Sequence, residues 1–270
     1  MTEKIPASVF IICKNEAANI GRALESVKMF DDIVLVDSGS TDETLEIARR
    51  YPCRRYFQAW LGYARQKQVA LELCRHEWAL NIDADEELSP ELGAEITAFL
   101  KAPGNHAGLS TAIRESFSGA LTHPRTHQNR HIRFLRRDRG RYNNSDVHEG
   151  IVLDGPAARA KHPILHYGES SIAVKVAKNN AYSTLRAEER RRKGRKPSVA
   201  KLVVIFPVMF LKSYFIRRAC LNGWRGFVVA MINAFYAFLK EAKLFEQGTR
   251  NIAPATAKPA LPDPAPQALD

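Results

Sequence analysis

Apolar and polar positions follow two patterns along the first hundred residues: short apolar runs and apolar residues at helical spacing. Short apolar runs end abruptly in polar clusters and predict buried strands at 8–13, 32–37 and 77–83. Between them, apolar residues recur at helical spacing. The predicted helices cover residues 19–30, 44–51, 62–75 and 89–101. Thr41 and Ser89 are the predicted N-caps of the second and fourth helices. Repeated βαβ units of this kind predict a mostly parallel sheet with helices on both faces.

Polar clusters stand at the carboxyl ends of the three strands. They read "KNE" (14–16), "DSGSTD" (37–42) and "DADEE" (83–87). Ligands of parallel sheets bind at this edge, so three clusters together predict a site. Taken alone, "DSGSTD" is equally typical of a turn, because Asp, Ser and Gly dominate loops.

The third cluster crowds carboxylates onto the end of an apolar strand. Like charges this close repel, so the cluster predicts a positive partner. Asp83 and Asp85 lie two residues apart, so their side chains leave the same face of the strand. Two carboxylates with open positions suit Mg²⁺ or Mn²⁺, which often share phosphate oxygens with a substrate. A lone D-x-D is common, but one that ends a strand of a βαβ series is more specific.

The net charge and the cysteine positions indicate the kind of partner and the cellular compartment of the protein. The 270 residues carry a formal net charge of +11, which indicates an anionic partner: nucleic acid, a phosphorylated substrate or an anionic membrane surface. The four cysteines are scattered without a C-x-x-C pair, which argues against a disulfide framework or a zinc site and favours a reducing compartment. The first apolar run, Val9 to Cys13, is too short for a signal peptide, so we expect the chain to start in the cytoplasm.

Four segments resemble the family 2 inverting glycosyltransferases, which have the GT-A fold. They are "SVFIICKNEAANIGRALESV", "DIVLVDSGSTDETLEIA", "ARQKQVALELC" and "WALNIDADEELSPEL". The resemblance covers residues 7–100 in close order and continues more loosely through "HIRFLRRDRGRYNNSDVHEG". Within the family, the chain is most similar to bacterial enzymes that add glucose or another hexose to the lipopolysaccharide inner core.

The resemblance implies a nucleotide-sugar donor, and each of the three polar clusters would supply part of its binding site. Asn15, Glu16, Asp37 and Ser38 would hold the uracil and ribose, Arg65 would approach the diphosphate, Asp83 would contact the ribose or the metal region, and Asp85 would ligate the cation. The metal and its diphosphate would let the carboxylates tolerate one another. Many relatives carry Asn where this chain has Gln68, which therefore receives no role.

An inverting transfer also needs a base for the acceptor hydroxyl. By resemblance, Glu149 in "NNSDVHEGIVLDG" is the predicted base. Asp146 is one alternative, and a structural ion pair of Glu149 with Arg133, Arg136, Arg137, Arg139 or Arg141 is another. His148 is predicted to contact the acceptor or the metal. His166 is predicted to ligate the metal, with a purely structural role as the alternative. The loop around 121–131 is expected to be a flap that orders on donor binding.

The second half of the chain predicts a helical, membrane-associating extension. A helix over 170–196 becomes densely cationic before Pro197. Two apolar runs follow, Leu202–Leu211 and Phe227–Leu239, each shorter than the ~20 residues that span a bilayer. Such helices can lie in the interface, with nearby arginines drawn to anionic lipid. The alternative is packing on the catalytic domain or on a second subunit.

These patterns predict a catalytic domain over 1–168, with a donor half (1–100) and an acceptor half (101–168). The helical extension covers 169–245, and the Pro- and Ala-rich residues 246–270 are expected to be disordered. The predicted protein is a metal-dependent hexosyltransferase on the inner face of the cytoplasmic membrane, acting on a lipid-linked saccharide. The oligomeric state is left open.

Two other functions compete with this one. A basic nucleic-acid-binding protein would explain the charge, but it would not explain "DADEE", and the chain has no zinc-finger or RNP motif. A nucleotidyltransferase would share the fold and metal, but such enzymes usually carry a Gly-rich basic loop after the first strand. "CKNEAAN" is neither Gly-rich nor basic.

Overall fold

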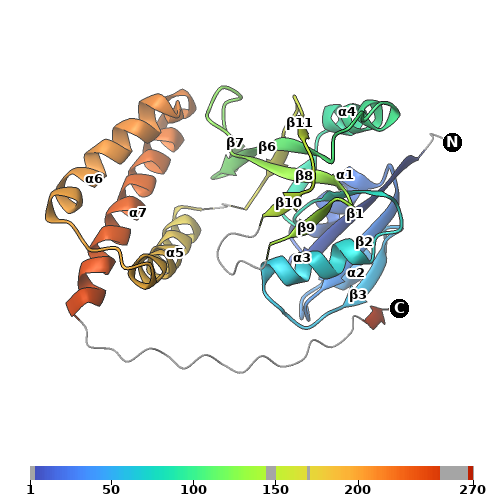
Figure 1. Cartoon of the computed structure of the whole chain (residues 1–270), viewed down its shortest axis with the longest axis horizontal. Coiled ribbons are helices and arrows are strands. Elements are labelled where there is room, and N and C mark those ends of the chain that lie inside the picture. Colours follow the sequence, from blue (N-terminus) through green and yellow to red (C-terminus); the bar gives the residue numbers. More distant parts are fainter. Residues whose placement is uncertain (1–3, 144–149, 169–170, 250–266, 270) are drawn as a thin grey trace. The chain divides into compact units, whose positions relative to one another are not determined.

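The computed structural model describes residues 4–143, 150–168, 171–249 and 267–269. It divides into two compact units, which we call the sheet unit and the helical unit (Figure 1). The sheet unit comprises the described parts of Met1–Arg114, Gln128–His166 and Leu261–Asp270. The helical unit comprises those of Glu115–His127 and Tyr167–Ala260. Residues 115–127, part of the predicted catalytic domain, thus group with the helices.

One main sheet organises the sheet unit, with strand order β13-β3-β2-β1-β4-β8-β6-β12-β5. The neighbours β3, β2, β1 and β4 are parallel, as predicted, whereas β8 runs antiparallel to both β4 and β6. β9 and β10 form a separate antiparallel pair, while β7 and β11 pair with β6. The strands are β1 (Ile5–Cys13), β2 (Phe30–Asp37), β3 (Arg54–Phe57), β4 (Trp78–Asn81), β5 (Glu86–Leu88), β6 (Gly108–Phe117), β7 (Ala120–Leu121), β8 (Arg130–Arg136), β9 (Gly140–Tyr142), β10 (Ile151–Leu153), β11 (Ala157–Arg159), β12 (Ile164–His166) and β13 (Gln267–Leu269).

The two faces of β1 feed two separate hydrophobic cores. Val9 and Ile11 pack with the apolar faces of α1 and α4, whereas Phe10 and Ile12 pack with α3. Successive side chains of a strand point to opposite faces, so a strand buried on both faces is a nearly continuous apolar run. The helices are α1 (Ile20–Val27), α2 (Thr44–Ala48), α3 (Tyr63–Glu72) and α4 (Pro90–Lys101).

Of the two predicted helix N-caps, one is confirmed and one is wrong. Ser89 caps α4, since its hydroxyl accepts the Leu92 N–H at 3.2 Å. Thr41 does not cap α2, because the helix begins later and the Asp42 carboxylate accepts the Thr44 N–H at 3.0 Å. The short strand β3 was not predicted, since its four residues are only partly buried and two are arginines.

The helical unit contains α5 (Ile172–Arg192), α6 (Val199–Leu211), the π-helical turn η1 (Lys212–Ile216), the 3₁₀ turn η2 (Ala219–Asn222) and α7 (Gly223–Thr249). The helical segment Val199–Ile216 has 18 residues, a mean hydropathy of 1.9 and only 6% of its residues buried. By length and composition alone it could cross a membrane, and it contains the apolar run Leu202–Leu211 with Lys201 and Lys212 on either side. α7 also continues past residue 245.

The predicted flap lies partly in this unit. The His123 N–H donates to Asn222 Oδ1 at 2.6 Å, and the His127 N–H donates to the Arg217 carbonyl at 3.0 Å. Asn222 also donates to the Thr126 hydroxyl at 2.9 Å. Residues 123–127 are therefore held against the connection between α6 and α7.

Candidate active site

The loop after β2 is organised around a buried carboxylate. Asp37 is 2% exposed and accepts the N–H groups of Gly39 and Ser40 at 2.8 and 2.9 Å, and it also accepts the Ser40 hydroxyl. Gly39 has a φ of +89°, a conformation that L side chains rarely adopt. Asp37 thus builds the turn that the sequence allowed as the simpler interpretation, and its predicted contact with a donor stays a prediction.

The loops after β1 and β2 are tied together by hydrogen bonds. The Asn15 N–H donates to Ser40 Oγ at 2.9 Å, while Asn15 Oδ1 accepts the Thr41 N–H at 2.8 Å. The Glu16 N–H donates to Thr44 Oγ1 at 2.8 Å. Two of the three polar clusters therefore form one continuous rim at the carboxyl end of the sheet.

A residue of α3 that was not singled out from the sequence supports this rim. Gln66 is fully buried, and its amide donates at 3.0 Å to both Ser38 Oγ and the Gln58 carbonyl. Its neighbour Arg65 is exposed on the same helix. Ser38 is thus a hydrogen-bond partner within the protein, and the contact of Arg65 with a diphosphate remains a prediction.

The DADEE cluster is neutralised in part by two protein cations. Asp83 lies 2.8 Å from Lys67 Nζ and 3.2 Å from an Arg133 guanidinium nitrogen. Glu86 lies 2.6 Å from Arg133. Arg133 also donates to Asn81 Oδ1 at 2.7 Å. The prediction that a metal and diphosphate alone stabilise the carboxylates was therefore incomplete, because Lys67 and Arg133 serve Asp83 and Glu86.

Burial and charge act in opposite directions on these two acids. Burial opposes ionisation of Asp83, but Lys67 and Arg133 outweigh it and hold the pKa of Asp83 well below its usual range. Burial raises the pKa of Glu86, and the charge of Asp83 adds to this rise against the effect of Arg133. Arg133 thereby serves the cluster, and its pairing with Glu149, which lies outside the described residues, stays an untested alternative.

Asp85 faces a different partner from its neighbours. Its Oδ2 lies 3.0 Å from Nε2 of His166, and the two side chains are 25% and 18% exposed. Strand pairing explains this approach: β12 runs antiparallel to β5, with His166 opposite Glu86. Asp85 immediately precedes β5, so the pairing delivers the histidine to it. The structure thus brings together the two predicted metal ligands.

Glu16 belongs to the same electrostatic neighbourhood. Burial raises its pKa, the hydrogen bond from Asn19 at 2.9 Å lowers it, and the charges of Asp85 and His166 act on it with opposite signs. The strand-end rim after β1 and the Asp85–His166 pair therefore influence one another, as the ends of neighbouring parallel strands β1 and β4 should.

The predicted acceptor-side residues Asp146, His148 and Glu149 lie outside the described residues. Their roles stay predictions.

Comparison with known proteins decides the family. The model of the family "Glycosyl transferase family 2" matches residues 8–153, which is more than half of the chain. The chain belongs to this family. It is therefore a glycosyltransferase, and inversion at the anomeric carbon is a general property of family 2.

Two relatives match the family 2 chain over nearly its full length. The lipopolysaccharide core biosynthesis glycosyltransferase LpsC of Rhizobium meliloti is 39% identical, over 92% of this chain and 94% of LpsC. A glycosyltransferase of Rickettsia bellii is 38% identical, over 91% of this chain and 87% of its own length. This family 2 enzyme is thus a homologue of a lipopolysaccharide core glycosyltransferase.

Among solved structures, the mannosyltransferase PcManGT from Pyrobaculum calidifontis, in complex with GDP-mannose and Mn²⁺, is 15% identical. It covers 91% of this chain and 88% of its own, with a TM-score of 0.52. The predicted GT-A fold is confirmed.

Two side chains of this family 2 site are suitable ligands for a divalent cation. Asp85 offers carboxylate oxygen and His166 imidazole nitrogen, both partly exposed. Within the part of the chain that the structure describes, no group of three or more His, Cys, Asp or Glu side chains could hold a metal. A cation on Asp85 and His166 would therefore need further oxygen ligands from outside this set, and phosphate groups are such ligands.

Proposed function

We propose that this family 2 enzyme transfers a hexose, glucose first among the choices, from a UDP-sugar to a lipid-linked saccharide such as the lipopolysaccharide core. The similarity to LpsC supports this class of acceptor. The site requires Mg²⁺ or Mn²⁺, and the enzyme works on the inner face of the cytoplasmic membrane.

One observation carries the proposal: Asp85 and His166, 81 residues apart in sequence, meet at 3.0 Å beside the strand-end rim. They would hold the divalent cation, which supplies positive charge for the departing diphosphate. The nucleoside would be bound by Asn15, Glu16, Asp37 and Ser38 of the rim. The diphosphate would be contacted by Arg65. Asp83, whose carboxylate is held by Lys67 and Arg133, would contact the ribose or the metal region.

The transfer is a single displacement. The acceptor oxygen forms its bond to the anomeric carbon as the bond to the diphosphate breaks, and the nucleoside diphosphate leaves with the electron pair. The proton of the acceptor hydroxyl passes to a carboxylate, for which we keep Glu149 with Asp146 as the alternative. His148 would contact the acceptor or the cation.

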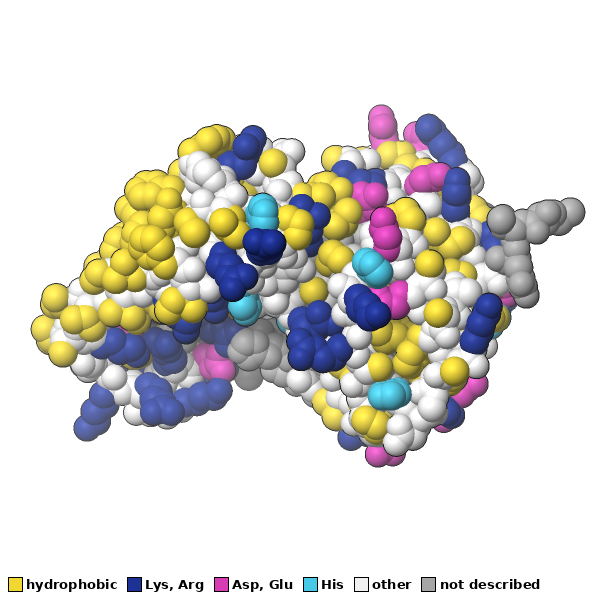
Figure 2. All heavy atoms as spheres, turned by 90° about the horizontal axis from the view of Figure 1, so that it is seen from above, with side chains coloured by type: hydrophobic (Ala, Val, Ile, Leu, Met, Phe, Trp, Pro, Cys, Tyr) yellow, Lys and Arg dark blue, Asp and Glu magenta, His cyan; other side chains and the backbone are white. Residues whose placement is uncertain are grey.

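Exposed apolar side chains on the helical unit support the proposed membrane contact. Val203, Phe215 and Ile216 are 69%, 59% and 76% exposed, and Trp224 follows at 56%. Figure 2 shows hydrophobic side chains gathered over this unit with Lys and Arg side chains along the border. Arg225 stacks over the Trp224 ring at 4.9 Å, an arrangement suited to the headgroup layer.

A panel of donors tests the function. The full-length protein is incubated with UDP- and GDP-hexoses and Mn²⁺ or Mg²⁺, and the released nucleoside diphosphate is measured with and without a chelator. We expect chelator-sensitive release from a UDP-hexose. Pyrophosphate release from UTP and a hexose 1-phosphate would instead indicate a nucleotidyltransferase, and a gel shift of RNA or DNA without donor turnover would indicate the nucleic-acid alternative.

A further inference from the structure

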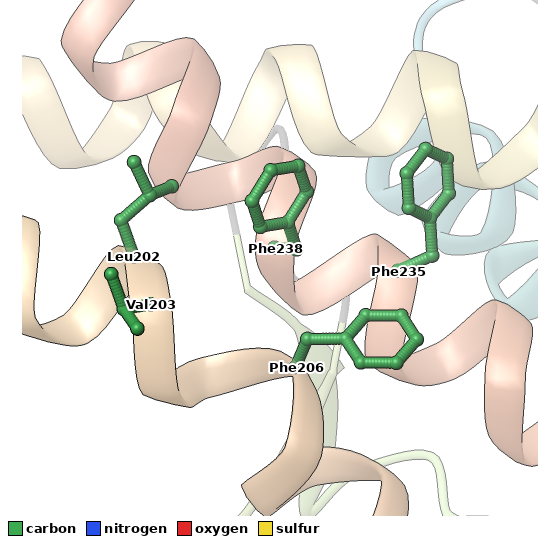
Figure 3. A pocket seen from close by; sticks show the side chains of 5 residues that line it. All are labelled: Leu202, Val203, Phe206, Phe235 and Phe238. Carbon is green, nitrogen blue, oxygen red and sulfur yellow. The ribbon is translucent and has the colours of Figure 1, made fainter.

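Buried polar side chains gather in the sheet unit, whereas the groove of the helical unit is apolar. Five apolar side chains line the groove between α6 and α7: Leu202, Val203, Phe206, Phe235 and Phe238 (Figure 3). In the sheet unit, four side chains that are at most 9% exposed are joined by hydrogen bonds beside the turn that carries Asp85: Asn81, Glu86, Arg133 and Tyr142. Because buried polar groups are costly unless they are hydrogen-bonded, their partners indicate what they do.

The turn that carries Asp85 is closed by two hydrogen bonds between its first and last residues. The Glu86 N–H donates to the Asp83 carbonyl at 2.9 Å. In return, the Asp83 N–H donates to Glu86 Oε2 at 2.8 Å. The backbone and the side chain of Glu86 therefore both hold Asp83, with Asp85 between the two residues.

Arg133 ties this turn to the strand β8. One of its guanidinium nitrogens donates to Glu86 Oε1 at 2.6 Å and to Asp83 Oδ2 at 3.2 Å. The other donates at 2.7 Å to Asn81 Oδ1, which also accepts the Tyr142 hydroxyl at 3.0 Å. Glu86 thus uses one carboxylate oxygen to close the turn and the other to bind Arg133, so the turn is fixed both internally and to a neighbouring strand.

We propose that Glu86 and Arg133 are positioning residues for the metal ligand Asp85. They hold the turn in the conformation that presents the Asp85 carboxylate to His166 at 3.0 Å. Both side chains are buried, so they act through the turn and not by touching the cation or the donor. Ligands that are already held in place lose less conformational freedom when a cation binds, which strengthens binding. This role deepens the proposed function and rests on its cation site.

The Mn²⁺ dependence of UDP binding tests the role. UDP is titrated calorimetrically into the full-length protein at a series of Mn²⁺ concentrations, and the concentration that gives half-maximal UDP affinity is called the Mn²⁺ requirement. Glu86→Gln keeps the volume of the side chain but has one acceptor oxygen, which cannot serve both the Asp83 N–H and Arg133. We expect its Mn²⁺ requirement to rise about tenfold, the lower end of the effect of residues that orient metal ligands. Arg133→Met, which frees the turn from β8, should have the same effect.

Two further variants separate positioning from stability. Glu86→Gln added to Arg133→Met removes the stranded charge and should recover part of the stability against urea, but the turn stays free of β8, so the Mn²⁺ requirement should stay raised. Arg54→Met is the matched control, because it breaks a buried pair with Asp32, 2.8 Å away near the amino-terminal ends of β2 and β3. It should lower the stability and leave the Mn²⁺ requirement unchanged. Unfolded molecules reduce the number of sites that calorimetry counts but do not change the affinity of the folded ones.

The outcomes distinguish the positioning role from the cation site itself. If Asp85→Ala loses the Mn²⁺ dependence while Glu86→Gln and Arg133→Met keep the wild-type requirement, the cation site stands and the positioning role is wrong. A requirement raised equally in Arg54→Met, or restored together with stability in the double variant, would also overturn the role. If wild type binds UDP without Mn²⁺, the proposed cation site falls, and the positioning role falls with it.

Discussion

Replacement of Arg133 by methionine removes the cation that the buried Glu86 and the partly buried Asp83 share. Glu86 is 2% exposed and lies 2.6 Å from Arg133, whereas Asp83 keeps Lys67 at 2.8 Å. Breaking a buried ion pair from one side costs about 3–5 kcal/mol, because an uncompensated charge is left behind. We expect Arg133→Met to lower the free energy of unfolding by that amount, a large part of the about 5–15 kcal/mol of a typical domain.

The decrease in the free energy of unfolding caused by Arg133→Met should also depend on pH. Burial already raises the pKa of Glu86 above its ordinary value, and removing Arg133 should raise it further, because Arg133 is the main influence lowering it. A folded-state pKa above the unfolded one means that protonation favours the folded state. The variant should therefore regain stability as the pH falls toward 5 and should be weakest near pH 8, where Glu86 is ionised in the unfolded state and folding must either bury that charge or take up a proton.

Urea unfolding followed by circular dichroism at pH 5 and pH 8 measures both effects. Glu86→Gln in the Arg133→Met background removes the stranded charge and should recover part of the loss. Arg136→Met is the control on the same strand, since Arg136 pairs with Asp138 and Glu77 near the surface and should matter little. A cost for Arg133→Met below about 1 kcal/mol, or one that does not change with pH, would refute the assigned network.

Three further predictions concern the base, the α4 cap and the membrane. Glu149→Gln should lower turnover about 10²–10⁴-fold with donor affinity unchanged, and a variant that keeps more than half of its activity would move the role to Asp146 or another group. Ser89→Ala should cost about 1 kcal/mol of unfolding free energy, measured by urea, whereas Thr41→Ala, at a position that does not cap α2, should cost much less. Vesicles containing phosphatidylglycerol should capture the full-length protein better than pure phosphatidylcholine vesicles, with capture weakening as salt rises; equal capture at all salt concentrations would contradict the electrostatic part of the contact.

Local patterns predicted the sheet unit well up to β4. The runs that became β1, β2 and β4 are apolar at most of their buried positions, with Ser8, Asp32, Asp37 and Asn81 as buried polar exceptions. Ser89 carries its own capping oxygen, so neighbouring residues decide these features. The short strand β3 was not predicted, because its side chains are only partly buried and give no apolar run in the sequence. The cap of α2 was misassigned because Asp42, one residue later than Thr41, reaches the Thr44 N–H.

The partners of the carboxylates could not be predicted from local pattern. Arg133 is 50 residues from Asp83, and only the pairing of β8 with β4 brings it there. His166 was predicted to join Asp85 by resemblance alone, and the pairing of β12 with β5 supplies the physical reason. Gln66 and Lys67 sit within a helix whose apolar spacing conceals that both are buried against the site.

In the proposed site, Asp85 and His166 hold the cation that binds the donor diphosphate. Calorimetric titration with UDP, in Mn²⁺ and in chelator, tests it most directly in wild type, Asp85→Ala and His166→Ala. Asp31→Ala is a matched control, because Asp31 forms a similar pair with His76 at 2.8 Å, at the amino-terminal ends of β2 and β4 and so away from the candidate site. We predict that UDP binding in wild type and Asp31→Ala requires Mn²⁺, and that both site variants lose this dependence. Unchanged Mn²⁺-dependent affinity in Asp85→Ala would contradict the account.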